Sequence, residues 1–135
     1  MIYLSEKRLK NTLKVIKWLS KQKKIVEILY PYKPSTRSYK LWKKYYSGAS
    51  GLMGVIIKSK SKSSVYSFVN SLELFGIGYS WGGYSSLAVY NDQAEMGVRR
   101  FFNLEKNCHL VRIHIGLEDT RDLINDLKRA LSRVK

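Results

Sequence analysis

Residues 110–119, which read LVRIHIGLED, carry the clearest structural pattern in the chain. Apolar and polar side chains alternate along it, and this period of two predicts a β-strand, because successive residues of a strand point to opposite faces of its sheet. The face expected to meet the core carries Val111, Ile113 and Ile115. The opposite face carries Leu110, Arg112 and His114. The strand is therefore predicted to present an arginine on the face away from the core.

A helix is predicted directly after this strand. Gly116 ends the strand, and Glu118 and Asp119 would supply the acidic first turn that a helix N-terminus favours. The apolar positions of the helix are Leu123, Ile124, Leu127, Leu131 and Val134. The strand and the helix packed on it would hold the Arg112 guanidinium in place, and a guanidinium held in this way can bind a carboxylate or phosphate through two parallel hydrogen bonds. The alternative is that Arg112 pairs with an acidic neighbour on the sheet surface.

Composition describes a single globular domain. The chain has 135 residues, of which 44% are hydrophobic and 26% charged. No apolar run is long enough to cross a bilayer and the N-terminus lacks the pattern of a signal peptide, so a cytoplasmic location without membrane contact is expected. The one cysteine, Cys108, cannot form an internal disulfide, which fits a reducing compartment.

The net charge of +15 is unevenly distributed. Residues 1–67 contain 16 lysines and arginines against two acids, whereas residues 68–135 contain 9 against 8. Such an excess can indicate a surface for nucleic acid or for an anionic membrane, or a surface that an acidic partner absent from this chain normally covers. The basic residues are spread out and few are arginines, whereas base-specific contacts favour arginine. Nucleic acid is therefore not expected as a specific partner, and any such binding should be weak and sensitive to salt.

The remaining elements follow from periodicity and from breaker residues. Helices are predicted at 5–22, with Ser5 as N-cap, at 39–46, and after the serine and lysine run 58–64. Strands are predicted at 24–29, 52–58, 74–81 and 85–90, and an irregular polar stretch at 91–107. This order predicts an α+β fold, with a mainly antiparallel sheet and helices packed on one face.

Residues 76–83, GIGYSWGG, are rich in glycine but lack the spacing and the lysine of a nucleotide-binding loop. Glycines here would let the backbone turn sharply and expose Ser80 and Trp81. No metal site is expected, because Cys108, His109 and His114 fall on different faces of the strand and a fourth ligand is missing. No serine, histidine and acid show the spacing of a catalytic triad.

Two stretches together carry a resemblance to a known family. Residues 75–87, FGIGYSWGGYSSL, and residues 111–119, VRIHIGLED, resemble the C-terminal domain of the pyridoxal-phosphate (PLP) enzymes of cysteine and methionine metabolism, the cystathionine β-lyases in particular. The similarity extends upstream through residues 47–52 and 42–44 to Tyr30 and Pro31, so it covers most of the chain. It implies the small α+β C-terminal domain of a fold-type I PLP enzyme.

The resemblance assigns roles to four residues. Arg112 matches the arginine that binds the α-carboxylate of the substrate. Ser80 matches the serine beside that carboxylate and the cofactor lysine, and Trp81 and Tyr79 match the aromatic wall of the pocket. The family's cofactor lysine, in a Ser-x-Thr-Lys setting, has no counterpart here, so neither a catalytic nor a cofactor-binding residue is expected in this chain. Ser85 stands where cystathionine β-lyases usually carry glutamate.

The resemblance also implies an arrangement of domains. Residues 1–135 would form a single substrate-carboxylate-binding domain, and residues 1–22 would be the linking helix from a PLP-binding domain. The implied function is that of a C-terminal fragment or split subunit of a carbon–sulfur lyase, which converts cystathionine to homocysteine, pyruvate and ammonia and is inactive alone. A chain carrying the complementary PLP domain would be its partner, and a homo-oligomer is possible. Two alternatives stay open, a non-catalytic remnant and a basic interaction domain.

Overall fold

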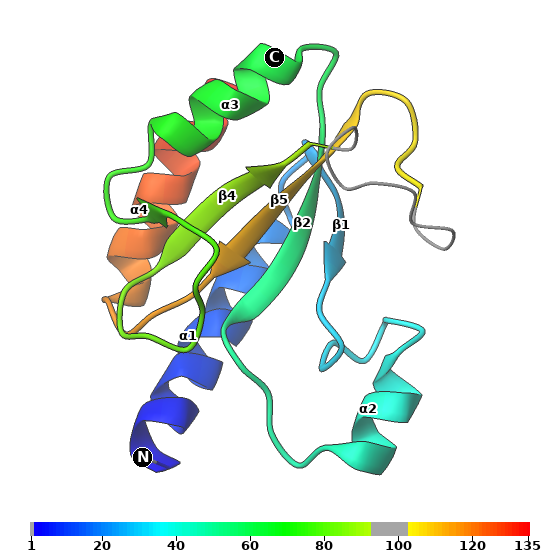
Figure 1. The fold of residues 1–135 in the computed structure, drawn as a ribbon, viewed down its shortest axis with the longest axis vertical. Helices are drawn as coiled ribbons and strands as arrows, with labels where there is room; N and C mark the ends of the chain where they lie inside the picture. Colours follow the sequence, from blue (N-terminus) through cyan, green and yellow to red (C-terminus); the bar gives the residue numbers. More distant parts are fainter. Residues whose placement is uncertain (1, 93–102) are drawn as a thin grey trace.

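The computed structural model describes residues 2–92 and 103–135 (Figure 1). Its helices are α1 (Ile2–Leu19), α2 (Tyr39–Tyr45), α3 (Lys62–Asn70) and α4 (Thr120–Leu131). Its strands are β1 (Ile25–Leu29), β2 (Leu52–Lys58), β3 (Gly76–Ile77), β4 (Leu87–Asn91) and β5 (Cys108–His114). None of the helices in these ranges combines the length and apolarity that a membrane span needs.

The five strands form one sheet in the order β1-β2-β5-β4-β3. Three neighbouring pairs are antiparallel, and the edge pair β3 and β4 is parallel. β5 lies at the centre, with Val111 opposite Val55 of β2 and opposite Tyr90 of β4. The predicted α+β fold with a mainly antiparallel sheet is therefore confirmed, and the strand that decided the prediction is the central one.

Helices α1, α3 and α4 cover one face of the sheet (Figure 1). Val111, Ile113 and Ile115 are fully buried against them, as the alternation predicted. Leu123 and Leu127 of α4 are also fully buried, and Val15 and Leu19 of α1 and Phe68 of α3 complete the same core. Burial of such side chains removes apolar area from water and stabilises the fold. Arg112 consequently lies on the face of β5 that the helices do not cover.

Several predicted boundaries are wrong. α1 begins at Ile2 and ends at Leu19, so Ser5 lies inside the helix and is not its N-cap; the residues before Ser5 include no glycine or proline that would stop a helix there. At the start of α4, Asp119 is the N-cap and accepts a hydrogen bond from the Arg121 N–H at 2.8 Å. Much of the predicted irregular stretch 91–107 lies outside the described residues.

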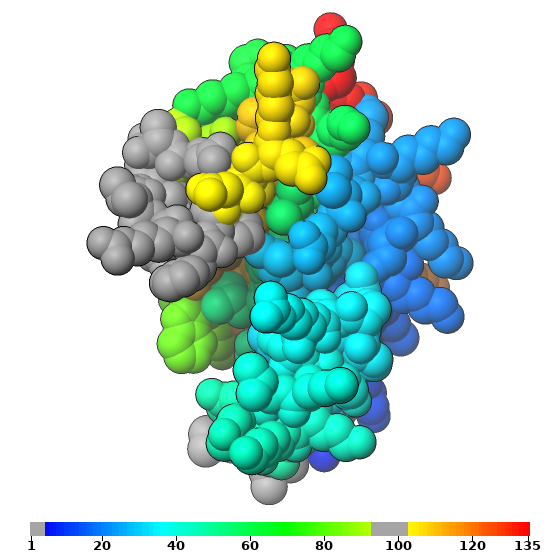
Figure 2. Space-filling model, turned by 90° about the vertical axis from the view of Figure 1, so that its right-hand side faces the viewer, coloured from blue at the N-terminus to red at the C-terminus, as the bar shows by residue number. Residues whose placement is uncertain are grey.

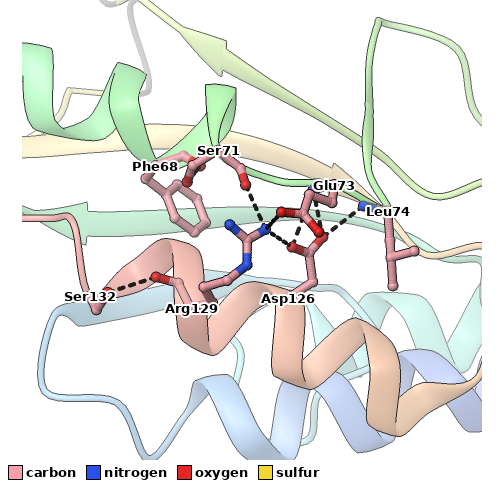
Figure 3. Close-up of polar contacts among 7 residues, drawn as sticks. All are labelled: Phe68, Ser71, Glu73, Leu74, Asp126, Arg129 and Ser132. Carbon is pink, nitrogen blue, oxygen red and sulfur yellow. Dashed lines mark hydrogen bonds and ion pairs between the residues drawn. The ribbon is translucent and has the colours of Figure 1, made fainter.

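Among the predicted strands, the strand at 74–81 differs most from the structure. Only Gly76–Ile77 pair with β4, and the chain leaves the sheet at Gly78 to form a loop over residues 78–84. The preceding turn is fixed from below by α4 (Figure 3). The buried Asp126 carboxylate accepts hydrogen bonds from the Glu73 N–H at 3.0 Å and the Leu74 N–H at 2.8 Å. The chain therefore enters β3 in an orientation that tertiary contacts impose, which periodicity alone does not reveal.

Candidate functional site

Arg112 projects from the face of β5 that the helices do not cover, opposite Gly54 of β2 and Val89 of β4. It is half-buried, and its Nη1 donates a hydrogen bond to the Tyr79 carbonyl at 2.5 Å. Its guanidinium carbon also lies 5.8 Å from the centre of the Tyr79 ring, within the range of a cation–π contact. The structure thus brings together two of the four residues to which the sequence assigned a role.

Ser80 and Trp81 lie on the same loop as Tyr79, between β3 and β4. Their side chains are exposed, Trp81 by 66%, and no hydrogen bond or ring contact between described residues joins either one to Arg112. Tyr79 is 62% exposed in spite of its contact with Arg112. The three side chains therefore form an open surface beside the guanidinium, and their assigned roles stay predictions.

Arg8 of α1 reaches the other end of this loop. Its Nη2 donates hydrogen bonds to the carbonyls of Gly82, at 2.9 Å, and Gly83, at 3.1 Å. Gly82 has a φ of 81°, in the left-handed region that favours glycine. Arg8 is the one arginine among residues 1–36, a segment otherwise rich in lysine, and no role was predicted for it.

His114 is buried below the loop, with 2% of its surface exposed, and not on a polar surface as the alternation suggested. Its Nε2 lies 3.4 Å from the Gly83 carbonyl, which makes Nε2 the protonated nitrogen, while Nδ1 has no partner among the described residues. Burial lowers the pKa of His114, and the charges of Arg8 and Arg112 lower it further, against the opposing effects of the Gly83 carbonyl and Glu118. The imidazole is therefore neutral at pH 7.

A second set of contacts fixes the end of the loop to the end of β5. The Glu118 carboxylate accepts hydrogen bonds from the Ser86 N–H at 2.6 Å and from the Ser86 hydroxyl at 2.8 Å. The Ser86 hydroxyl in turn accepts one from the Gly116 N–H at 2.8 Å. Gly116 packs so closely that a Cβ on it would lie 2.2 Å from the Tyr84 carbonyl oxygen. The loop is thus mounted on a rigid support.

The site contains two guanidinium groups and a neutral histidine. Within the described parts of the chain, neither Arg8 nor Arg112 forms an ion pair with a carboxylate. An unneutralised arginine beside an exposed aromatic ring is suited to the carboxylate of a small molecule. No lysine takes part in the contacts described for this loop, so the donor set fits an amino-acid carboxylate and not the aldehyde of PLP.

Other kinds of site are not evident. The residues that the structure describes include no group of three or more histidine, cysteine, aspartate and glutamate side chains that could hold a metal ion. A cavity of about 930 Å³, which Arg112 does not line, lies between the start of α1 and the connection that contains α2 (cyan to turquoise in Figure 2), and aromatic residues such as Tyr32 and Trp42 line it. Glu6 is the one charged residue among the described residues that line it, so this cavity offers no cationic group to an anionic ligand.

Comparison with known proteins gives three related findings. The family model for "Cys/Met metabolism PLP-dependent enzyme" matches residues 5–132. Cystathionine β-lyase MetC of Escherichia coli K12 is 32% identical over 126 residues, which cover 92% of this chain and 32% of the relative. An L-alanine/L-glutamate racemase of Wolbachia pipientis wMel is 40% identical over 135 residues, which cover 98% of this chain and 33% of the relative.

A solved structure has the same fold. It is a putative O-acetylhomoserine (thiol)-lyase of Campylobacter jejuni with N′-pyridoxyl-lysine-5′-monophosphate, and it superimposes with a TM-score of 0.78 at 28% identity, over 97% of this chain and 29% of that one. The chain spans about a third of the length of these relatives. The family predicted from residues 75–87 and 111–119 is confirmed: this chain belongs to the PLP-dependent enzymes of cysteine and methionine metabolism.

Proposed function

We propose that this chain is the substrate-carboxylate-binding part of a PLP-dependent carbon–sulfur lyase of the cystathionine β-lyase type. The observation that carries the proposal is Arg112, which lies on the face of the central strand that the helices do not cover, beside Tyr79, without a carboxylate partner among the described residues. Similarity to cystathionine β-lyases over more than 90% of the chain supports this choice of reaction.

The residues of this chain would bind and orient the substrate. Arg112 would donate two hydrogen bonds to the α-carboxylate, Ser80 would lie beside that carboxylate, and Tyr79 and Trp81 would form the wall of the pocket. A fixed carboxylate lets the site choose which bond at Cα faces the cofactor, and orientation of this kind lowers the barrier of the chemical step. When bound, PLP supplies the electron sink for the carbanion chemistry.

The cofactor lysine would come from the part of the relatives that this chain does not span, either in the same polypeptide or in a partner chain. Residues 1–22 would then lead from that PLP-binding domain. Residues 1–135 alone should not catalyse, since the described site provides no lysine for PLP. This proposal needs a PLP domain as partner and no membrane or nucleic acid.

The test is reconstitution. The chain is co-expressed with the cofactor domain of a cystathionine β-lyase, the complex is purified, and pyruvate release from cystathionine is measured. We expect release from the complex and none from residues 1–135 with PLP alone. A complex that binds PLP at its lysine yet releases no pyruvate would contradict the proposal. A stoichiometric adduct at one lysine of residues 1–135 alone, trapped with borohydride, would contradict the division of roles.

Amino-acid racemisation is a second candidate. The relative named an L-alanine/L-glutamate racemase is 40% identical, and Ser85 replaces the glutamate usual in cystathionine β-lyases. A racemase also needs a fixed α-carboxylate, so Arg112 would have the same role in both reactions. Chiral chromatography of L-alanine and L-glutamate incubated with the same complex separates the two functions. If no complex with any cofactor domain forms, the interpretation as a non-catalytic remnant gains support.

A further inference from the structure

We propose that Arg8 is a positioning residue of the carboxylate site, which fixes the orientation of the loop 78–84 relative to Arg112. The proposal goes beyond the proposed function, because that function assigns no role to α1 other than connection. It rests on the proposed function only where substrate binding is concerned. The geometry of the loop stands independently of any activity.

Two arginines bind the loop 78–84, one at each end. Arg112 binds the carbonyl of Tyr79 at one end, and Arg8 binds the carbonyls of Gly82 and Gly83 at the other. Ser80 and Trp81 lie between these anchors. A segment whose two ends are bound by guanidinium groups has few conformations left, so the directions of the side chains between them depend on both arginines.

The residues around Arg8 leave room for its side chain to reach the loop. The Cδ of Arg8 lies 3.1 Å from the position that a Cβ on residue 51 would occupy, so Gly51 leaves room for the side chain to cross from α1 to the loop. Arg8 is half-buried, and its buried Nε has no hydrogen-bond partner among the residues that the structure describes. An unpaired buried donor is costly, so this arrangement is not the one that stability alone would favour.

The contact with the loop depends on residue 8 being an arginine and not a lysine. The neighbouring basic residues of α1, such as Lys7 and Lys10, are exposed lysines. Nη2 alone donates to both carbonyls, and the planar guanidinium fixes the directions of its two N–H bonds, whereas the donors of an ammonium rotate freely. Arg8 also lies close enough to His114 to lower its pKa, and His114 approaches the same Gly83 carbonyl. Arg8 therefore acts on the loop directly and also on a second residue below it.

The test uses chymotrypsin, which cleaves after aromatic residues. The loop presents Tyr79, Trp81 and Tyr84, all more than 60% exposed, and the α2 region presents Tyr45 and Tyr46, both 66% exposed, as an internal reference. In Arg8→Gln we expect cleavage in the loop to rise roughly tenfold relative to cleavage after Tyr45 and Tyr46, because loss of a charge-assisted hydrogen bond favours local opening. Arg8→Lys should restore part of the protection. Lys10→Gln, which removes the same charge from an exposed position, should cleave like the wild type.

Two results would overturn the proposal. The first is unchanged loop cleavage in Arg8→Gln. The second is an equal rise at every site together with a lower melting temperature in both Arg8 variants, which would make Arg8 a general tether of α1. In the reconstituted complex we further expect Arg8→Gln to raise KM roughly tenfold with a smaller change in kcat, and Arg8→Lys to rescue part of it. Loop cleavage that responds to Arg8 in a complex without lyase or racemase activity would reject the proposed function and leave the positioning role intact.

Discussion

Two arginines bind the two ends of the segment around β3, and their electrostatic surroundings differ. Arg129 of α4 donates to the Ser71 carbonyl at 2.7 Å, and its charge is neutralised by Asp126 at 2.5 Å and by Glu73 at 3.3 Å (Figure 3). Arg112 of β5 donates to the Tyr79 carbonyl, and no carboxylate within the described residues lies in ion-pair range of it. The backbone contact is the same, but the charge is balanced at only one end.

This difference indicates what each arginine is for. The charge of Arg129 is already balanced by Asp126 and Glu73, so it has little attraction for an anionic ligand, and its value lies in fixing the turn. A guanidinium that binds only a carbonyl retains donors and a full positive charge for an incoming anion. The turn at residues 71–74 is accordingly a structural element, and the loop 78–84 belongs to the candidate site.

The largest effect is expected at Asp126. Asp126→Ala should reduce the free energy of unfolding by about 2–4 kcal/mol, because it leaves two N–H groups without an acceptor, while Arg129 keeps Glu73 as a partner. Urea denaturation measures the change, with Asp122→Ala, an exposed acid on the same helix, as control. Equal loss in both variants would mean that the turn does not depend on Asp126.

Arg112→Lys should instead affect activity. A lysine keeps the charge but loses the fork, so kcat/KM of the reconstituted complex should fall by the worth of one charged hydrogen bond, about 1.5–3 kcal/mol, or roughly 10- to 100-fold. The melting temperature should hardly change, and Arg121→Lys, with a side chain 90% exposed, is the control for charge-preserving substitution. Equal activity at equal stability would make Arg112 a sheet-surface arginine and remove its proposed role.

Gly116→Ala tests the support of the loop. The new Cβ would lie 2.2 Å from the Tyr84 carbonyl oxygen and 2.7 Å from the Ser85 carbonyl carbon, so the backbone must move. We expect a loss of about 1–3 kcal/mol in the free energy of unfolding, typical of overpacking. Gly48→Ala, where a Cβ meets nothing within 4 Å, is the matched control. If the two variants unfold at the same urea concentration, the contact between the end of β5 and the loop is not tight in solution.

The smallest effect concerns pH. The pKa of His114 is lowered in the folded chain, so below the unfolded value of about 6.5 the unfolded chain binds a proton that the folded chain does not. Stability should therefore fall as pH drops through 6.5, with a slope of at most about 1.4 kcal/mol per pH unit from this group. Melting curves at about pH 7.5 and about pH 5.5, one unit to either side of the unperturbed histidine pKa, measure this loss of stability. The slope should flatten in His114→Gln and persist in His109→Gln; the reverse would reject the assignment.

The parts of the fold that the sequence predicts correctly are those where burial sets a period. Val111, Ile113 and Ile115 alternate with polar residues because one face of β5 meets the helices, and Leu123 and Leu127 repeat at helical spacing for the same reason. β3 could not be predicted in this way. Its length depends on Asp126, which binds the turn before β3, and on the two arginines that bind the loop after β3. These contacts join residues far apart in the chain.

The candidate site shows the same limit. Alternation placed Arg112 correctly away from the core, but it also placed His114 on a polar surface, whereas the loop buries it. Periodicity describes one element at a time and does not show that a loop from elsewhere covers part of its face. Arg8 was missed because its partners are backbone carbonyls, which every residue type has, so the sequence does not identify them. The one signal in the sequence is that Arg8 is an arginine among lysines.

The central position of β5 has a consequence for synthesis of the chain. β2 pairs with β5 from Leu52 opposite His114 to Lys58 opposite Cys108, so the middle of the sheet cannot close until residues 108–114 have been made. Contacts of such long sequence separation form slowly, because the intervening chain must first lose its freedom. Until then the apolar β2 would have only β1 beside it, within the strongly basic first half. A nascent chain that pauses before residue 108 is therefore expected to stay unfolded and to depend on its positive charge, or on a chaperone, to avoid aggregation.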